Sequence, residues 1–303
     1  MPSWNEILSE LTACDRNNPL DFIRRKYLLE LNKKRGRNVI AYYSGWLQRP
    51  GILETSISDD DKNGLMAVIH KLDRSNGLDI LLHTPGGDMA ATESIVDYLH
   101  KMFGNDIECF IPQIAMSGGT MIACSGKLIH MGKQSNIGPI DPQFGGIPAH
   151  GVIEEFEEAI AAAKNEPTSI PIWQTIISKY HPTFVGECRN AITLADDIVQ
   201  EWLARNMFSD LVDPKKKAAQ VTKALNNHSD TKIHARHIPI EKAKKIGLRI
   251  VDLEKDQNLQ DLVLTVHHCF MHTFANSTCI KIIENHNGQC VMQKIAQAKG
   301  HRP

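Results

Sequence analysis

Three short apolar runs dominate the middle of the chain, at residues 79–83, 107–111 and 127–131. They are rich in the β-branched and aromatic side chains that are typical of buried strands. Between the first two, residues 90–103 repeat apolar positions at helical spacing. A strand, a crossover helix and a second strand form a parallel βαβ unit, so the pattern predicts an α/β fold. In such folds the ligand site lies at the carboxyl ends of the strands.

The flanking patterns divide the chain into three parts. Residues 1–37 read as an N-terminal helical segment, and residues 38–254 read as the main domain, with strands predicted at 38–44 and 249–254. Residues 255–303 read as an appendage of one helix and one hairpin. We expect a type I′ turn in the hairpin because its tip carries Asn287-Gly288.

Two glycine-containing turns follow the predicted strands, at residues 84–87 (TPGG) and 116–119 (MSGG). Ser117 lies between a strand and a small-residue segment that can begin a helix, which would hold a nucleophile outward beside the positive helix end. The Gly118 amide and an amide of the Gly86-Gly87 pair could both donate to an oxyanion. These groups suit acyl transfer. The alternative is that both turns are ordinary connections between strands and helices.

Three segments in this order resemble the serine dehydrogenase proteinase family: TPGG at 84–87, AMSGGT at 115–120 and SNIGPIDPQ at 135–143. That family belongs with the signal peptide peptidase A proteases in the Clp protease/crotonase fold. The resemblance covers roughly residues 38–254. It implies an α/β fold with a repeated β-α-β core, flanked in this chain by the N-terminal helices and the C-terminal helix and hairpin.

The resemblance also implies a serine endopeptidase that hydrolyses polypeptide through an acyl-enzyme on Ser117. The amides of Gly87 and Gly118 would form its oxyanion hole. No GxGxxG follows a predicted strand, so we expect no nicotinamide cofactor despite the family's name. Relatives pack their late helices between subunits, which implies a homo-oligomer. The large apolar side chains in that region are Trp173, Trp202, Leu203 and Phe208.

The general base departs from the Clp pattern, in which a histidine follows the serine on the strand after its helix. Here Asp141 stands near that place, and His130 comes too early. The Ser-Lys dyad of the signal peptide peptidases is therefore the closer analogy. A lysine base needs partial desolvation to be neutral near pH 7. Lys179 has apolar and aromatic neighbours on both sides, whereas Lys164 ends a polar helix, so we expect Lys179.

His237 is a further candidate. Relatives resemble the HIPI segment at 237–240 in carrying a histidine shortly before Pro-Ile. We regard His237 and Asp141 as candidates for supporting roles, and a structural histidine as the alternative. The three histidines between 228 and 237 match no zinc spacing with a fourth ligand, so we expect no metal.

The composition indicates the cellular compartment and the class of partner. Lys+Arg 34 against Asp+Glu 35 gives a net charge of −1, which does not favour nucleic acid as a partner. The seven cysteines are scattered without a CxxC and several lie in apolar runs, as in a reducing compartment. No basic and apolar leader opens the sequence, and no apolar run approaches the roughly 18 residues of a membrane helix. We expect a soluble, cytoplasmic protein.

Two other functions stay open from the sequence. A crotonase-type acyl-CoA enzyme would use the same pair of amides to stabilise a thioester enolate, although no adenine-binding signature is evident. A non-catalytic scaffold or adaptor could keep the fold and bind a protein partner through residues 255–303. Both differ from a peptidase in not requiring Ser117 as a nucleophile.

Overall fold

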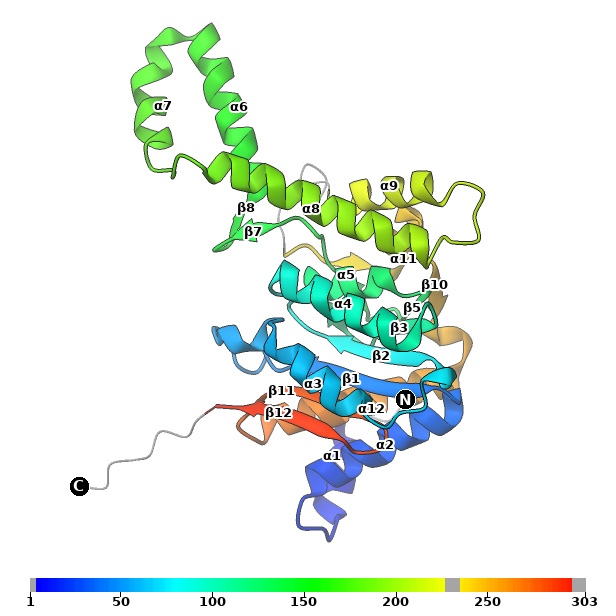
Figure 1. Cartoon of the computed structure of the whole chain (residues 1–303). Helices are drawn as coiled ribbons and strands as arrows, with labels where there is room; N and C mark the ends of the chain where they lie inside the picture. The colour runs from blue at the N-terminus through cyan, green and yellow to red at the C-terminus, as the bar shows by residue number, and fades with distance from the viewer. Residues whose placement is uncertain (1–3, 227–234, 296–303) are drawn as a thin grey trace, which may run out of the picture.

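The computed structural model describes residues 4–226 and 235–295, so His228 and His234 lie outside the described residues. Its centre is a seven-stranded sheet in the order β10-β5-β3-β2-β1-β11-β12 (Figure 1). β10 through β1 are parallel, and β11 and β12 are antiparallel. The strands are β1 (Asn38–Ser44), β2 (Leu78–His83), β3 (Ile107–Ile111), β5 (Leu128–Met131), β10 (Ile250–Asp252), β11 (Cys279–Asn285) and β12 (Cys290–Lys294). This mostly parallel sheet confirms the predicted α/β class.

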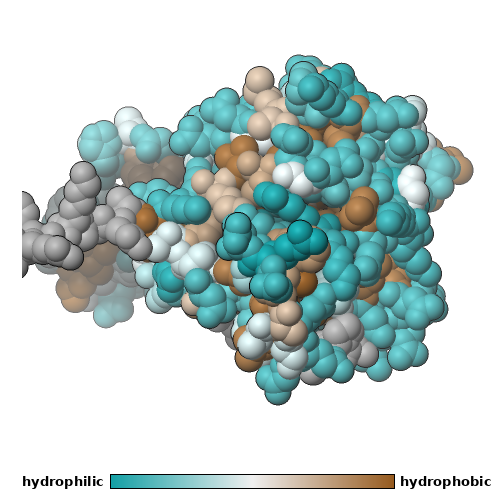
Figure 2. All heavy atoms as spheres, turned by 90° about the horizontal axis from the view of Figure 1, so that it is seen from below, coloured by the Kyte–Doolittle hydropathy of each residue, from teal (hydrophilic) through white to brown (hydrophobic). Residues whose placement is uncertain are grey.

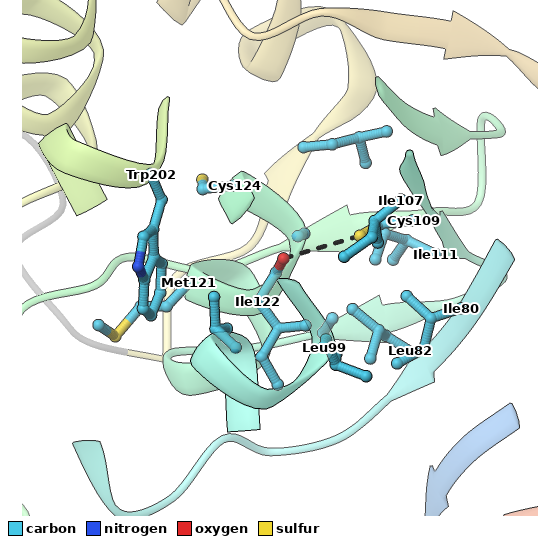
Figure 3. Packing of buried hydrophobic residues seen from close by; sticks show 14 of the residues in the cluster. Ile80, Leu82, Leu99, Ile107, Cys109, Ile111, Met121, Ile122, Cys124 and Trp202 are labelled. Carbon is cyan, nitrogen blue, oxygen red and sulfur yellow. Dashed lines mark hydrogen bonds between the residues drawn. The ribbon is translucent and has the colours of Figure 1, made fainter. Parts of the chain in front are cut away.

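Helices cover both faces of the sheet, because alternate side chains of its strands point in opposite directions. One face packs against α3 (Asp60–Ile69), α4 (Met89–Phe103), α5 (Gly118–Ser125), α8 (Phe184–Arg205) and α9 (Pro214–Leu225). In this core Ile80 and Leu82 lie near Leu99, and the Cys109 thiol is 3.7 Å from the Ile122 carbonyl (Figure 3). The other face packs against α2 (Pro19–Arg35) and α12 (Gln257–Ala275) through residues such as Leu81 and Phe110.

The C-terminal hairpin extends this sheet at its β1 edge. β11 pairs antiparallel with β1 from Ile40↔Asn285 to Ser44↔Lys281. The hairpin prediction is confirmed, but the type I′ turn is wrong: Gly288 has a φ of 79° and Asn287 has no positive φ. The Asn285 side chain instead accepts from two amides of a longer turn. The division of the chain at 37/38 and 254/255 stays a prediction, and both flanking parts pack on the sheet.

Two helices project from the body, α6 (Ala149–Asn165) and α7 (Ile170–Ile177) (Figure 1). α6 shares a small core with the start of α8 and with Tyr180, which packs beside Phe156. Ile160 and Ile172 are 59% and 65% exposed on this projection. A groove of about 500 Å³ runs between the two helices and is lined by apolar residues that include Phe156, Ile160 and Trp173.

The side chains expected at an interface between copies divide into two groups. Trp202, Leu203 and Phe208 are at most 5% exposed and belong to the main hydrophobic core, so they are not available to a second copy. Their part of the prediction is wrong because α8 packs on α5 and α9 of its own chain. Trp173 lies in the groove of the projection and is half-buried.

The remaining surface is largely polar. The face seen in Figure 2 is covered mostly by hydrophilic side chains, with apolar side chains in small groups among them. Within residues 4–226 and 235–295, no helix is both long enough and apolar enough to cross a membrane. α1 (Trp4–Ala13) adds a small core of its own, where Ile7 and Leu11 pack against Ile23 and Cys269.

Candidate active site

The two glycine turns are joined through a second, three-stranded sheet. This sheet has the order β4 (Ile114–Ala115), β6 (Asn136–Ile137), β9 (Ile238–Pro239). On its other side, β4 meets Thr84 at the end of β2. The Thr84 amide donates to Ile114 O at 3.2 Å, and the Met116 amide donates to Thr84 O at 3.0 Å. The TPGG and MSGG turns therefore lie side by side, as expected for loops after neighbouring strands.

Ser117 has an unusual backbone conformation. It is the residue before α5, with φ 49° and ψ −116°, and Lys71 is the only other non-glycine residue with positive φ in the described chain. Strain of this kind costs roughly 1–3 kcal/mol and persists where surrounding structure enforces it. The Ser117 hydroxyl does not cap the helix, and the residue is half-buried. This is the geometry of a nucleophile elbow, a sharp strand-to-helix turn that presents a side chain outward.

The amides of Gly87 and Gly118 adjoin at this turn. A Cβ added to Gly118 would lie 3.6 Å from the Gly87 nitrogen. Neither amide donates a hydrogen bond to any residue in the described parts of the chain. Gly118 is the first residue of α5, where a helix has no internal acceptor to offer. Two unpaired amides beside Ser117 could both donate to a substrate oxygen.

Close approach of two backbones explains the glycines. A Cβ on Gly86, whose φ is 92°, would lie 2.6 Å from the Ser117 Cβ. A Cβ on Gly87 would lie 2.3 Å from the Ile57 nitrogen. Ile57 forms a parallel bridge with Gly87, in which its amide donates to Gly86 O at 2.8 Å and its carbonyl accepts from the Asp88 amide at 3.0 Å. The sequence patterns did not reveal that Ile57 lies against Gly87.

The two lysines predicted as bases lie on the projection. Lys164 is in the last turn of α6, and Lys179 follows α7. Both side chains are exposed, and neither makes an ion pair or a side-chain hydrogen bond within the described residues. The protomer therefore does not provide the desolvation that a lysine base needs. The structure does not bring either lysine together with Ser117, and the Lys179 assignment stays a prediction.

The three-stranded sheet places His237 near the serine turn. Ala115, Ile137 and Ile238 lie side by side across the three strands, and His237 is the residue directly before β9. A Cβ on Gly138 would lie 3.3 Å from the Met116 Cα, one residue before Ser117. His237 is exposed, and Asp141, three residues beyond Gly138, is 1% exposed. His237 and Asp141 thus flank the three-stranded sheet that leads into Ser117, the first directly before β9 and the second four residues after β6.

His130 belongs to a different cluster. Its Nε2 lies 2.6 Å from Glu108 Oε2, and its ring stacks on Phe110 at 4.0 Å. Burial alone would raise the pKa of Glu108, but His130 and Arg35 outweigh it and lower that pKa to about 2. Phe110 faces the α2 and α12 layer, whereas α5 covers the opposite face of the sheet. This separates His130 from Ser117.

The described residues provide no set of ligands for a metal ion. Among the described side chains, no group of three or more His, Cys, Asp or Glu residues could hold a metal ion. The groups that meet at the serine turn are a hydroxyl and two backbone amides. A hydroxyl beside two hydrogen-bond donors suits nucleophilic chemistry.

Comparison with known proteins places this geometry in a family. The uncharacterised protein MJ0137 of Methanocaldococcus jannaschii is 27% identical over 252 residues, which is 82% of this chain and 78% of the relative. The uncharacterised protein MJ1495 of the same organism is 29% identical over 230 residues, which is 75% of this chain and 71% of the relative. The ClpP-like SDH-type serine proteinase family matches residues 12–277, a span that includes every strand of the sheet except β11 and β12. The chain belongs to this ClpP-like serine proteinase family.

Proposed function

We propose that this protein is a serine peptidase that cleaves polypeptide through an acyl-enzyme on Ser117. The observation that carries the proposal is the Ser117 backbone, at φ 49° and ψ −116°, beside two amides without acceptors. A residue that only connected a strand to a helix would have no need of this conformation. The family membership supports the same reaction.

The geometry supports a conventional acyl transfer. Ser117 Oγ attacks the carbonyl carbon of the scissile bond while a base takes its proton. The amides of Gly87 and Gly118 stabilise the negative charge that develops on the carbonyl oxygen. The C–N bond then breaks, the amine leaves with a proton, and water hydrolyses the ester to release the second product.

Two residues are candidates for the base. Lys179 requires burial that the isolated protomer does not supply, so its use depends on a further contact that covers it. His237 is the second candidate, since histidine is the most common general base in enzymes. The position of His237 directly before β9, in the sheet that leads into Ser117, favours it, and we assign to the buried Asp141 the role of orienting it, as the third member of a triad does.

We further propose an extended substrate that pairs with the Pro85–Gly87 loop. Ile57 occupies one edge of this loop through its bridge to Gly87. The opposite edge would then receive the substrate strand, and Gly87 is exposed there. Main-chain pairing of this kind gives affinity with little dependence on side chains.

The proposal also includes the oligomeric state of the protein. We propose a homo-oligomer in which the groove of the α6–α7 projection receives a second copy, since its apolar lining is open on one protomer. A cytoplasmic location and a protein partner at the C-terminal hairpin remain predictions of the sequence.

A fluorophosphonate probe tests the nucleophile. We expect the wild type to be labelled and Ser117→Ala to be neither labelled nor able to hydrolyse peptides, since removing a triad member leaves only a small residual rate. Ser125→Ala is a matched control because that serine lies at the other end of α5 and bonds to Ile122 O. Equal labelling of wild type and Ser117→Ala would refute the nucleophile and leave the scaffold as the better function.

Single alanine variants distinguish the bases. We expect His237→Ala to lower turnover strongly, and Lys179→Ala and Lys164→Ala to retain most of it. The opposite result, with Lys179 essential, would support the Ser-Lys dyad. It would also require a second copy in the oligomer to bury the Lys179 side chain.

A further inference from the structure

Lys281 is an unusual residue for the inner face of a sheet. It lies on β11, between isoleucines in the run CIKII, and is 2% exposed. Lysine is almost never fully buried unless its charge is paired. Its ammonium group donates to three oxygens: Ser56 O at 2.7 Å, Asp61 Oδ1 at 2.8 Å and Asp61 Oδ2 at 3.0 Å.

Asp61 shares this buried centre with two further donors. Its Oδ2 accepts from the Tyr42 hydroxyl at 2.7 Å and from the Ser58 amide at 2.9 Å. Asp61 itself is 1% exposed, at the start of α3. Two of these contacts hold the same short piece of chain, because Lys281 binds the carbonyl of Ser56 and Asp61 binds the amide of Ser58.

The sheet adds a parallel contact one residue earlier. Ser44, which pairs with Lys281 across β1 and β11, donates its hydroxyl to Thr55 O at 2.6 Å. Segment 55–58 is therefore fixed by side chains of two neighbouring strands. It contains no helix or named strand beyond Thr55, so these contacts are its main anchors.

Ile57, at the centre of this segment, is the residue that contacts the oxyanion loop. Its backbone bonds to Gly86 O and to the Asp88 amide on both sides of Gly87, and its Cδ1 would lie 3.2 Å from a Cβ on Gly118. The direction of the Gly87 amide thus depends on the position of Ile57. That position depends in turn on Lys281, more than 200 residues away in the chain.

We propose that Lys281 is a positioning residue for the reaction at Ser117, which it serves by holding segment 55–58 against the oxyanion loop. This inference rests on the proposed function. A buried ion pair is often no more stabilising than well-packed apolar side chains of similar size. Stability is therefore a weak explanation for this lysine, whereas directed hydrogen bonds to one carbonyl explain it directly. The C-terminal hairpin becomes part of the catalytic framework.

The test is Lys281→Met in the full chain, with two measurements. Hydrogen exchange in the segment around Asp88 should become faster, because its amide donates to the carbonyl of Ile57. Turnover of a peptide substrate should fall by about tenfold to a hundredfold with KM nearly unchanged, the scale expected for small misplacements of a catalytic group.

A double variant separates positioning from stability. Lys281→Met combined with Asp61→Asn leaves no unpaired buried carboxylate, so it should regain stability towards urea. Turnover should stay low, because Ser56 O still lacks its donor. Recovery of turnover together with stability would overturn the inference, as would unchanged exchange around Asp88 in the single variant.

A second ion pair on the same strand provides the matched control. Arg24 of α2 and Glu284 of β11 are both buried, and they pair on the other face of the sheet. Arg24→Met with Glu284→Gln should change stability without changing turnover or exchange near Asp88, and an equal loss of turnover would also overturn the inference. If the wild type shows no Ser117-dependent labelling, the proposed function fails, while the exchange measurement still decides whether Lys281 holds the loop.

Discussion

Gly87→Ala is the most direct perturbation of the proposed oxyanion hole. The new Cβ would lie 2.3 Å from the nitrogen, 2.4 Å from the oxygen and 2.8 Å from the Cα of Ile57. These are backbone atoms, so no side-chain rotation can relieve the overlap. Either the loop or segment 55–58 must move, and both bonds between Ile57 and the loop would be distorted.

The expected magnitude follows from the loss of one donor. Removing a single oxyanion-hole donor costs about 100-fold to 1000-fold in kcat, or roughly 3 kcal/mol. Gly118→Ala should be milder, about tenfold, because its Cβ would meet the Thr92 hydroxyl at 2.7 Å and the end of the Ile57 side chain at 3.2 Å. Those groups can rotate aside, whereas a backbone cannot.

Steady-state kinetics on a fluorogenic peptide provide the assay, together with the rate of fluorophosphonate labelling. We expect kcat to fall while KM changes little, because the amides act on charge that develops in the transition state. Gly104→Ala is the control. Gly104 also has a positive φ, 61°, but nothing lies within 4 Å of its added Cβ. That variant should lose about 1 kcal/mol of stability and no activity.

A rise in KM with kcat intact would refute the reasoning, since it would indicate that Gly87 docks substrate and does not stabilise an oxyanion. A Gly118→Ala variant more damaging than Gly87→Ala would contradict the steric ranking.

Two further predictions concern stability and assembly. Burial lowers the pKa of His83 and of His267, the latter to about 3, so the unfolded chain binds protons more readily. The free energy of unfolding should therefore fall as pH drops below about 6.5, by up to about 1.4 kcal/mol per pH unit for each histidine. Urea denaturation at pH 7 and 5 should show a smaller loss for His267→Phe than for the wild type, and equal losses would contradict it. In light scattering at micromolar concentration, Ile160→Asp in the groove should give monomers, whereas Ile172→Asp outside it should not; a monomeric wild type would refute the assembly.

Local patterns were sufficient for most of the fold. β1 and β3 have the predicted bounds, and α4 begins one residue before its predicted start. Hydrophobic periodicity and turn residues act over a few positions, so the sequence alone reveals them. The same local chemistry indicated both glycine turns and Ser117, because glycine is required where two backbones approach closely.

Two expectations failed where contacts outside the local pattern decided the outcome. Trp202, Leu203 and Phe208 were expected at an interface, yet they lie in the main hydrophobic core. The Asn-Gly pair at 287–288 suggested a type I′ turn, but Asn285 organises a longer one. Propensity is a weak preference that such contacts override.

The sequence by itself determined the α/β class, the main strands and the serine turn, since each depends on residues close together in the chain. Only the tertiary structure decided that Ile57 lies against Gly87, that Lys281 reaches Asp61, that the strand after His237 pairs with β6, and that Lys179 is exposed. These are matters of register and packing between segments up to 220 residues apart. No local pattern encodes them, because the free energy that selects them comes from burying whole faces of the sheet at once.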